Sequence, residues 1–478
     1  MAEYLIEGKL DNTVHDITYE QIKQLYYDNK REEREGWGMT DSSYRGESFY
    51  SNNSKNLGNE IEREYLERDS RTAGFRIEYP HGVVIEQAVR KNYYRGENQV
   101  YKESIPSLNR TLNLYETNQE RELYRMVSDM RIAEFSFLLQ KFKHVKEWNY
   151  GDILYEVIAQ HYGLQTGWLD ITSDFNVALF FATCFFDYKE KRWKPLTKIQ
   201  TEIDENHKYG IIFHMPSNRM GIRWCQEQDK FSTVSSKVIE TDGNGNPTKY
   251  EILEHPRAGL PENIAYPIGF QPFMRCHMQN GYGIYMRNNQ PLQEDILFEK
   301  LRFKHEEQLS KRIFEKMQGG ELIYPHEGLK EADYIIEDIA HETDFSEEAF
   351  SYALKRNHYY KLSEPQKCKE DLNNFEVEGK RVNIVSKHPW KLSAGRRKKI
   401  DALYDDFSIE KHYGIKIVQR KRANRSGGIF EPWMLCETDD EPGIIDFHAR
   451  PASDCTSVQD RNMFRILHMI KNAKLSDF

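Results

Sequence analysis

Cysteine is scarce in this sequence and shows no paired spacing. The 478 residues contain six cysteines, and none of them forms a CxxC motif; they lie at positions 184, 225, 276, 368, 436 and 455. Zinc sites and disulfide frameworks depend on regularly spaced cysteines, so this pattern argues against both. We therefore expect a protein of the reducing cytosol.

Long apolar runs are also missing. The apolar stretch "ALFFATCFF" at 178–186 is far shorter than the ~20 residues of a membrane helix. The opening "MAEYLIEGKLDNTVHD" lacks the basic region and apolar run of a secretion signal. These absences predict a soluble cytoplasmic protein with no membrane partner.

The common nucleotide-binding and catalytic motifs are absent as well. The sequence has no GxGxxG at a helix start, no GxxxxGK(S/T), no HExxH, no GxSxG and no HRD…DFG set. The 16 histidines show no metal-ligand spacing, and the neighbours Cys276 and His277 would point to opposite faces of a strand. We predict no metal site.

The composition is polar, yet it is that of a folded protein. Hydrophobic residues make up 38% of the chain and charged residues 30%, and 29 Tyr and 25 Phe supply large side chains for a core. The net charge of −9 argues against a protein that coats nucleic acid over its whole surface. We expect a helical and loop region at 1–75, an α+β domain at 76–340 and a mixed C-terminal domain at 341–478.

Periodicity places the elements within this frame. Apolar spacing predicts helices at 119–142, 152–163 and 175–186, with Asp152 capping the second and Thr172, Ser173 or Asp174 capping the third. Further helical patterns cover 294–318 and 328–340. Short β-rich segments predict a strand and a connection at 74–89, strands at 208–215, 281–286 and 321–325, and a hairpin at 240–252. The mixed order of strands and helices indicates an α+β fold.

The segment "NYYRGENQVY" at 92–101 places one arginine between aromatic residues and a glycine. Arg95 is therefore expected near the end of a strand, where Gly96 lets a ligand or another backbone approach closely. A guanidinium held by flanking aromatic rings suits a diphosphate, which it can bind through two hydrogen bonds. The alternative is a structural arginine in a salt bridge.

Two further segments carry candidate site residues. "QHYGLQTGWLDITSD" at 160–174 places Thr172 and Ser173 where a strand gives way to a helix. These hydroxyls either cap the helix or hold a ribose beside its N-terminus, and His161 is either a core histidine or a pocket wall. In "FQPFMRCHMQNGYGIYM" at 270–286, Gln279 either faces a ligand across a cleft or belongs to the turn before the strand.

Together these segments resemble the FRG domain family, named for its Phe-Arg-Gly motif. The resemblance rests on "YRG…PSLNR", "AQHYGLQTGWLDITSDFNVALFFA", "R…QNGYG" and the stretch 300–335, and it covers roughly 80–340. The sequence departs from the family pattern where Tyr94 replaces Phe, Gln165 replaces Pro, Gly167 replaces Arg and Ile171 replaces Trp. The change at Gly167 removes a positive charge that the family usually carries.

A looser resemblance links the order of these motifs to ADP-ribosyltransferases of the Arg-Ser-Glu type. It implies a split β-sheet core with flanking helices, and NAD as the substrate. On this basis Arg95, with Gly96, holds the diphosphate, and Thr172 and Ser173 brace the nicotinamide ribose. Tyr162 or Trp168 stacks on the nicotinamide, and His161 and Asp170 complete the NAD-binding wall.

The matching position for the catalytic glutamate is Gln279, which can donate and accept hydrogen bonds but cannot neutralise charge. Cleavage of the N-glycosidic bond needs a carboxylate to stabilise the oxocarbenium-like ribose. Arg95, Thr172 and Gln279 thus form the predicted catalytic set, and Glu97, Asp170 and Glu262 are the carboxylates that can substitute for the missing glutamate.

Two hypotheses follow. The first is an NAD-dependent ADP-ribosyltransferase-like enzyme of bacterial or phage origin, a toxin or antiviral effector that modifies a protein or nucleic acid. The basic runs at 396–399 and 420–422 would contact such a target, or they are simply solvated surface. The second is a non-catalytic module that binds a nucleotide or a partner, which Gln279 favours. Residues 341–478 recognise the substrate, bind an inhibitor protein or complete the core.

Overall fold

The structure is a computed structural model, and it describes most of the chain from residue 92 to residue 406. The described residues are 92–146, 155–216, 219, 275–286, 290–357 and 359–406, with shorter pieces at 11–22, 24–25, 49–51, 74–79, 82–87, 237–241, 247–251, 265–267 and 272–273. Glu262, Asp152 and the basic run at 420–422 lie outside these ranges, so the predictions for them stay predictions.

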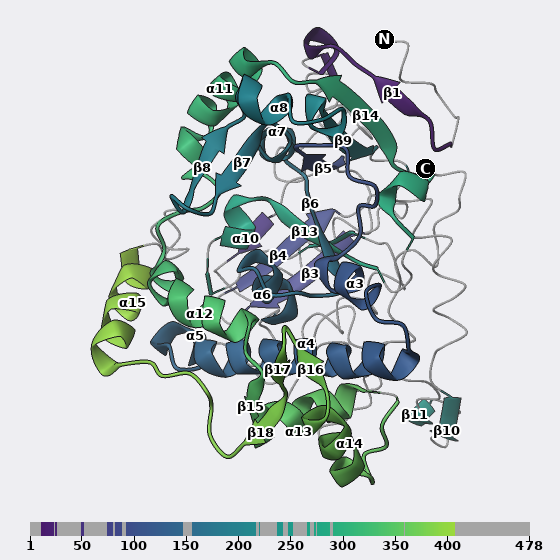
Figure 1. Ribbon diagram of the computed structural model, residues 1–478, viewed down its shortest axis with the longest axis vertical. Coiled ribbons are helices and arrows are strands. Elements are labelled where there is room, and N and C mark those ends of the chain that lie inside the picture. Colours follow the sequence, from purple (N-terminus) through teal and green to yellow (C-terminus); the bar gives the residue numbers. More distant parts are fainter. Residues whose placement is uncertain are drawn as a thin grey trace.

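A seven-stranded mixed sheet forms the upper half of the molecule (Figure 1). Its strand order is β1-β14-β9-β5-β6-β13-β12. β1 pairs with β14 in parallel, and the remaining neighbours are antiparallel. The strands are β1 (Val14–Asp16), β14 (Glu299–Lys304), β9 (Tyr209–Met215), β5 (Tyr93–Glu97), β6 (Trp168–Thr172), β13 (Gly281–Tyr285) and β12 (Ala265–Pro267).

The sheet is nearly divided between β5 and β6. The two strands share one paired position, Tyr94 with Thr172, whereas β5 pairs with β9 over five positions and β6 with β13 over five. Beyond Tyr94 the strands therefore separate. This mixed architecture is compatible with the predicted α+β class.

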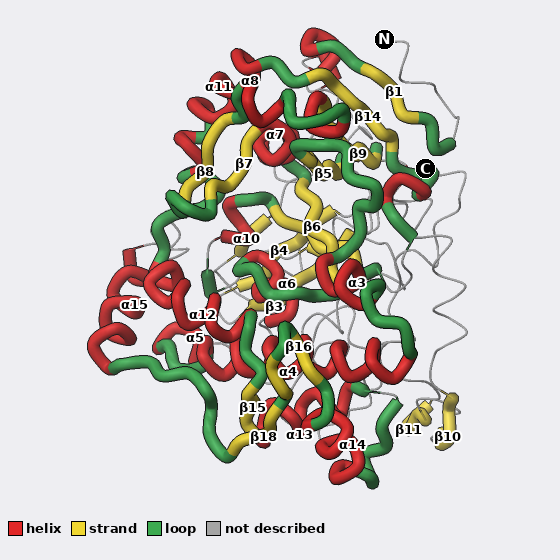
Figure 2. The backbone as a smooth tube through the Cα atoms, in the orientation of Figure 1, coloured by secondary structure: helices red, strands yellow, loops and turns green. Residues whose placement is uncertain are grey.

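Helices lie on both faces of the sheet and below it (Figure 2). They are α3 (Ser107–Leu112), α4 (Asn118–Leu139), α5 (Lys143–Lys146), α6 (Tyr155–His161), α7 (Phe175–Thr183), α8 (Lys198–Thr201), α10 (Arg275–Met278), α11 (Glu307–Lys316), α12 (Asp333–Ala340), α13 (Glu347–Arg356), α14 (Pro365–Asn373) and α15 (Ala394–Asp406). Short 3-10 turns are η4 (Asn206–Lys208), η5 (Leu292–Glu294), η6 (Gln318–Gly320) and η7 (Gly328–Ala332).

Smaller strand pairs complete the described part of the chain. They are β3 (Gly74–Tyr79) and β4 (Gly82–Gln87) with β2 (Phe49–Ser51), β7 (Cys184–Asp187) with β8 (Arg192–Pro195), β10 (Lys237–Thr241) with β11 (Pro247–Glu251), β15 (Asp344–Ser346) with β18 (Asn383–Val385), and β16 (Glu376–Val377) with β17 (Lys380–Arg381).

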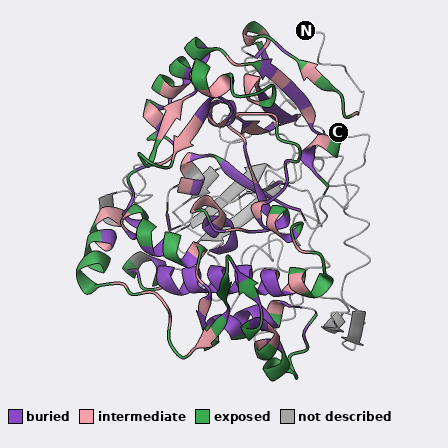
Figure 3. Ribbon diagram, in the orientation of Figure 1, coloured by how far each residue is buried: buried purple, intermediate pink, exposed green. Residues whose placement is uncertain are grey.

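Helix α4 is the central support of the lower half. Its start is fixed by a capping box, in which the Thr117 hydroxyl accepts from the Glu120 amide and the Glu120 carboxylate accepts from the Thr117 amide. From Leu123 onward nearly the whole helix is buried (Figure 3), because α6, α12 and α13 pack against it. The 22 residues of α4 confirm the helix predicted at 119–142.

One hydrophobic cluster spans the sequence boundary expected at residue 340. It joins residues 108–137 of α3 and α4 to residues 345–382, including Phe345, Tyr352 and Leu372. The C-terminal residues described up to 382 therefore share a core with the residues before 340. No helix in the described ranges has both the length and the hydropathy needed to cross a membrane.

Helix α7 packs directly on β5, and Gly96 makes the close approach possible. A Cβ atom at Gly96 would lie 1.7 Å from the carbonyl oxygen of Ala178. The close approach expected at Gly96 is therefore that of the α7 backbone. Around it, Tyr94, Phe175, Phe180 and Ile212 belong to one core cluster.

We expect Gly96→Ala to destabilise the protein by about 3 kcal/mol, the upper end of the range for an overpacked interior, because α7 must move away from β5. Urea denaturation measures the loss. Gly395→Ala in α15 is the matched control, since a Cβ there meets no atom within 4 Å. An equal stability of Gly96→Ala and wild type would contradict the close packing of α7.

Many of the predicted elements were confirmed: β9, β13, the β10–β11 hairpin and α12 lie where the sequence patterns placed them. The helix predicted at 175–186 begins at Phe175 but ends at Thr183, because residues 184–187 form β7. Cys276 and His277, expected on a strand, belong to helix α10. The helix predicted at 294–318 is wrong in its first half, because residues 299–304 form β14 between β1 and β9. The strand predicted at 321–325 is also wrong: Ile323 and Tyr324 donate to the carbonyl of Gly320 and form a turn. Residues 74–87 form two paired strands where one was expected.

Candidate functional site

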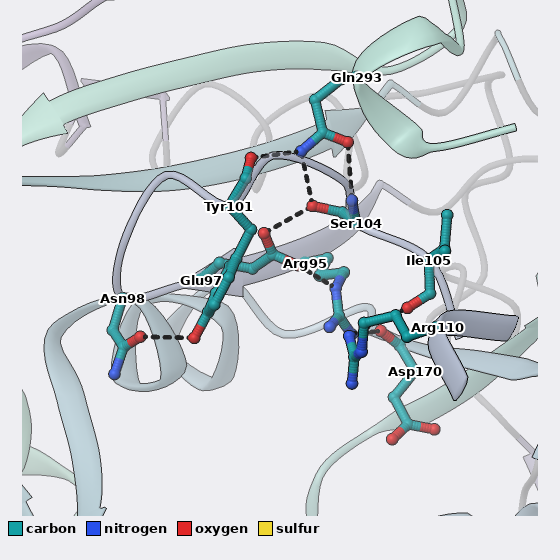
Figure 4. A network of polar contacts seen from close by, with 9 residues as sticks. All are labelled: Arg95, Glu97, Asn98, Tyr101, Ser104, Ile105, Arg110, Asp170 and Gln293. Carbon is teal, nitrogen blue, oxygen red and sulfur yellow. Dashed lines mark hydrogen bonds and ion pairs between the residues drawn. The ribbon is translucent and has the colours of Figure 1, made fainter. Parts of the chain in front are cut away.

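Arg95 lies where β5 and β6 separate. Its Nη1 donates to the main-chain carbonyl of Asp170 at 2.8 Å, and its Nε donates to Glu97 Oε1 at 2.8 Å (Figure 4). The guanidinium thus provides a hydrogen-bond donor for the Asp170 carbonyl of β6, which lies beyond the single position, Tyr94 with Thr172, where β5 and β6 pair. Its side chain is 22% exposed, and among the described residues Nη2 has no hydrogen-bond partner. Arg95 is fixed by the protein and still has a free donor edge.

A chain of polar contacts holds Glu97 in place. Glu97 is buried, and its second oxygen accepts from the Ser104 hydroxyl at 2.7 Å. Gln293 bonds both the amide and the hydroxyl of Ser104, and it donates to the carbonyl of Tyr101. The loop after β5 is therefore tied to the Arg95 ion pair, as Figure 4 shows.

A second guanidinium, that of Arg110, lies beside Arg95 (Figure 4). Arg110 is in α3, and its Nη1 donates to the carbonyl of Ile105 at 3.1 Å. Burial and the positive charge of Arg95 lower the pKa of Arg110, whereas Glu97 acts in the opposite direction. The positive charges of Arg95 and Arg110 are thus balanced by only one buried carboxylate, that of Glu97. Positive charge is therefore in excess where β5 and β6 separate.

His161, Gln279 and Asp170 form a second cluster that reaches Arg95 through Asp170. His161 Nδ1 lies 3.0 Å from Gln279 Oε1, and the Gln279 amide nitrogen donates to the carbonyl of Ile323 at 3.1 Å. This bond fixes the amide so that its oxygen faces the ring, and Nδ1 is therefore the donor. The other ring nitrogen, Nε2, lies 3.6 Å from Asp170 Oδ1.

Burial opposes a charge on the His161 ring, but the neighbouring Cys276 sulfur and the Asp170 carboxylate outweigh it and raise the pKa of His161 to about 9. Arg275 acts in the lowering direction. The side chain of His161 is 3% exposed and that of Asp170 is 33% exposed. The buried imidazolium therefore faces a carboxylate that solvent or a ligand can reach.

We expect the stabilising effect of His161 to depend on pH. A folded-state pKa near 9, above the ordinary 6.5, gives stability that is fully present below pH 6.5 and is lost as the pH rises through 9. The unfolding free energy of wild type minus that of His161→Gln should shrink by on the order of 1–3 kcal/mol between pH 6 and pH 9.5. Urea denaturation at several pH values measures this difference, and a constant difference would contradict it.

The hydroxyl of Thr172 makes two hydrogen bonds within the protein. It donates to the carbonyl of Gln279 at 2.7 Å and accepts from the amide of Asp174 at 2.9 Å. The N-cap of α7 is Asp174, whose carboxylate accepts from the Asn176 amide. Ser173 is half-buried beside them, and its amide donates to the carbonyl of Asn280. Thr172 thus joins β6 to the segment before β13, and its predicted ribose contact stays a prediction.

The two aromatic residues predicted to stack on nicotinamide both pack against other residues of the protein. Trp168 is 1% exposed, and its ring lies against Gly283 and edge-on to Tyr285. The Arg275 guanidinium covers one face of the Tyr162 ring at 3.9 Å, and the Tyr162 hydroxyl donates to Glu327. A stacking role for Trp168 would require the core to open.

Asp170 is the candidate carboxylate that the structure leaves most available. Glu97 is buried and bonded to Arg95 and Ser104. The side chain of Asp170 is 33% exposed as a whole, although its Oδ1 is buried 3.6 Å from His161 Nε2 and makes no hydrogen bond among the described residues. Its main-chain carbonyl accepts from Arg95, whereas its carboxylate faces His161 and points away from the two guanidiniums (Figure 4).

Sequence reasoning missed Arg110, although the residue closes the segment "PSLNR" that contributes to the family resemblance. It placed Arg275 with Gln279 as polar residues before the strand at 281–286, but it did not predict that Arg275 and Cys276 lie around His161. The structure brings Arg95, His161, Asp170, Thr172 and Gln279 together through the contacts given above, and it adds these three residues to the set.

Comparison with known families identifies one domain. Residues 90–191 match the FRG domain family, and this segment contains Arg95, Arg110, His161, Asp170 and Thr172. The chain therefore contains an FRG domain, which spans less than half of its length. The wider resemblance up to residue 340, including Gln279, stays a prediction. No curated protein and no solved structure matches the chain.

Proposed function

We propose that this chain is an NAD-dependent ADP-ribosyltransferase-like enzyme that modifies a macromolecule. The observation that carries the proposal is the pair of guanidiniums, Arg95 and Arg110, at the point where the sheet divides. Arg95 donates to the main-chain carbonyl of Asp170, and the partly exposed carboxylate of the same residue lies on the His161 side. A diphosphate needs the first kind of group, and a developing positive charge on ribose needs the second.

The arginine pair suits the diphosphate of NAD. Arg95 is held by Glu97 and the Asp170 carbonyl, so its free Nη2 edge is oriented before a ligand arrives. Arg110 adds a second planar donor group, and charge-assisted bonds from guanidinium to phosphate are short and directional. Burial, and then the charge of Arg95, lower the pKa of Arg110, and the charge of a bound dianion opposes both effects.

Asp170 supplies the carboxylate that Gln279 cannot. As the bond between ribose C1′ and the nicotinamide nitrogen breaks, its electron pair leaves with nicotinamide and positive charge develops on the ribose. The Asp170 carboxylate stabilises that charge until a nucleophile of the target attacks C1′ and loses its proton. The His161 ring, with Nε2 3.6 Å from Asp170 Oδ1, limits the movement of the carboxylate.

One observation favours a second candidate function, a nucleotide-binding module without turnover. Both ends of the Gln279 amide are bonded within the protein, to His161 and to the carbonyl of Ile323. The position that matches the catalytic glutamate is therefore a structural link. In this alternative, Arg95 and Arg110 bind the nucleotide and no bond is broken.

The test measures nicotinamide release from NAD, and ADP-ribose transfer to protein, RNA and DNA, by the full-length chain. We expect Arg95→Ala to reduce turnover at least 100-fold and Arg110→Ala to weaken NAD binding. Arg381→Ala, at an exposed arginine of β17 that pairs with Glu376, is the matched control and should leave both unchanged. Binding without turnover would support the second candidate. The absence of both an NAD-dependent product and an NAD-induced thermal shift would remove both candidates.

A further inference from the structure

The hairpin formed by β7 and β8 presents a tyrosine and several basic side chains to solvent. Its tip, "DYKEKRWK" at 187–194, interleaves aromatic and basic residues. Tyr188 is 83% exposed, and its ring lies edge-on to that of Phe186 with 5.2 Å between the ring centroids. Lys189 and Lys191 are exposed as well. Exposed aromatic rings flanked by cations are typical of surfaces that bind single-stranded nucleic acid.

The turn that carries Tyr188 is fixed by Asp187. Oδ1 of Asp187 accepts from the amide of Lys189 at 2.9 Å and from that of Glu190 at 3.1 Å. Lys194 Nζ donates to Asp187 Oδ2 at 2.8 Å and also to the carboxylate of Glu190. Both acidic residues of the hairpin therefore serve the turn, and the Tyr188 ring is positioned before a ligand arrives.

Contacts on both sides of the hairpin place it next to the candidate site. On one side, the Asn98 side chain in the loop after β5 donates to the carbonyl of Cys184, the first residue of β7, at 3.0 Å. On the other side, the Trp193 ring of β8 stacks on that of Tyr324 with 5.4 Å between centroids. The guanidinium of Arg275 lies 5.1 Å from the same Tyr324 ring. The hairpin thus joins the loop after β5 to the Arg275 side of the site.

The Tyr188 phenol also interacts electrostatically with two tyrosines of the site. Burial raises the pKa of Tyr101, and the Tyr188 phenol raises it further. Tyr101 interacts with Arg95 and Arg110 as well, and their positive charges act in the opposite direction. Burial raises the pKa of Tyr324 to about 12, again with a contribution from Tyr188. The exposed ring therefore lies in the vicinity of the guanidinium pair.

The positive charge at the tip is only weakly compensated. Lys189 makes no ion pair with any residue that the structure describes. Lys191 lies 3.3 Å from Glu337 of α12, and these two side chains are 72% and 63% exposed. Ion pairs at such exposure are weak, so a phosphate group can replace Glu337. The tip is thus a local basic patch on a chain whose net charge is negative.

An acidic helix separates this patch from the basic run at 396–399. α12 contacts the hairpin through Glu337, and it contacts α15 through Tyr334, whose ring lies 4.7 Å from the Arg396 guanidinium (Figure 1). Three acidic residues of α12 are exposed, Asp333, Glu337 and Asp338. The hairpin and α15 are therefore distinct basic surfaces, and the hairpin is the one that adjoins the guanidinium pair.

We propose that the β7–β8 hairpin docks the macromolecular target of the proposed transferase and that this target is single-stranded nucleic acid. A base stacks on the Tyr188 ring, and the neighbouring phosphates bind Lys189 and Lys191. Its role as the target rests on the proposed function, whereas binding to the hairpin requires no turnover. A single strand fits an exposed ring because a duplex hides the faces of its bases. An acidic peptide would match the charge but offers no base to the ring.

Fluorescence anisotropy of the full-length chain without NAD tests this surface, with labelled single-stranded oligothymidine and oligouridine as probes. We expect Tyr188→Ala to weaken the binding of both at least tenfold, because stacking on the ring is lost. Tyr188→Phe should bind like wild type, since stacking needs the ring and not the hydroxyl. Tyr359→Ala is the matched control, at an exposed tyrosine that packs edge-on to Tyr360.

Salt dependence tests the two lysines separately from the ring. Lys189→Gln combined with Lys191→Gln should make the slope of log affinity against log salt concentration less steep by about 1.4, the value for two phosphate contacts on a single strand. Tyr188→Ala should leave that slope unchanged. Lys361→Gln, at an exposed lysine elsewhere, is the control for the loss of charge. An unchanged slope in the double lysine variant would overturn the phosphate contacts.

Further outcomes decide between this target and other partners. Binding of a duplex or of polyglutamate as tight as that of the single strand would overturn the assignment, as would wild-type affinity in Tyr188→Ala. Loss of NAD binding in Tyr188→Ala, with oligonucleotide binding kept, would place the adenine of NAD on this ring instead. Tyr188-dependent binding without nicotinamide release would remove the proposed enzyme and still support the nucleic-acid surface. Transfer of ADP-ribose to protein alone would keep the enzyme and overturn the target.

Discussion

Arg356→Met should lower the free energy of unfolding by about 3–5 kcal/mol, the cost of removing one partner from a buried ion pair. Arg356 in α13 donates to Glu156 of α6 at 3.0 Å, and its Nε lies 3.8 Å from Asp129 of α4. The side chains of the three residues are 11%, 7% and 7% exposed. Burial opposes the charge, but the two carboxylates outweigh it and raise the pKa of Arg356 well above its ordinary value.

The loss arises because the substitution leaves two buried carboxylates without their guanidinium. Urea denaturation measures it, and Lys369→Met is the control. Lys369 pairs with Glu347 at an exposed site, where an ion pair contributes less than about 1 kcal/mol. Arg356→Met combined with Asp129→Asn and Glu156→Gln should recover part of the stability. Similar losses for Arg356→Met and Lys369→Met would show that the buried cluster does not join the three helices.

Elements with a clear apolar period could be predicted from the sequence, and β14 shows why others could not. A strand buried on one face should alternate, but Lys300 lies among the apolar residues of β14 and is itself fully buried. Its ammonium group donates to Asn12 and to the carbonyl of Asp295. Asn12 comes from a distant part of the chain, so the local pattern did not indicate that a lysine could be buried here and resembled a helix instead.

The turn at 321–325 shows a second limit of local pattern. "ELIYP" has the composition of a strand, but it follows two glycines with positive φ, Gly319 and Gly320. A Cβ atom at Gly320 would lie 3.1 Å from the ring of Phe180, so α7 packs closely there. Tertiary packing therefore overrides the strand propensity of the segment.

The candidate site was predicted in part because its motifs are contiguous. Arg95, Asp170 and Thr172 stand in two short segments, and the register of Tyr94 with Thr172 brings these segments together. Gln279 was matched to a catalytic position, but its partners His161 and Ile323 come from distant segments and decide what its amide does. Arg110 reaches Arg95 only through the loop that Ser104 and Gln293 hold. Contacts of this kind require the fold.

Asp170→Asn should reduce nicotinamide release about 100- to 1000-fold and change NAD affinity little, if the chain turns over NAD as proposed. The substitution keeps the main-chain carbonyl that Arg95 binds and the shape of the side chain, and it removes only the negative charge. A charge that acts on the transition state lowers kcat when it is lost and leaves ground-state binding largely intact. Single-turnover kinetics and calorimetric NAD titration measure the two effects separately.

Glu97→Gln provides the contrast. Glu97 bonds Arg95 and Ser104 and is buried, so its loss should loosen the guanidinium and weaken NAD binding. Gln279→Glu should not restore the activity of Asp170→Asn, because a carboxylate there would face the carbonyl of Ile323, now the acceptor of the Gln279 amide at 3.1 Å. A wild-type kcat in the Asp170→Asn variant would show that the catalytic charge belongs to another residue. Rescue by Gln279→Glu would place it at residue 279, in the manner of the Arg-Ser-Glu enzymes.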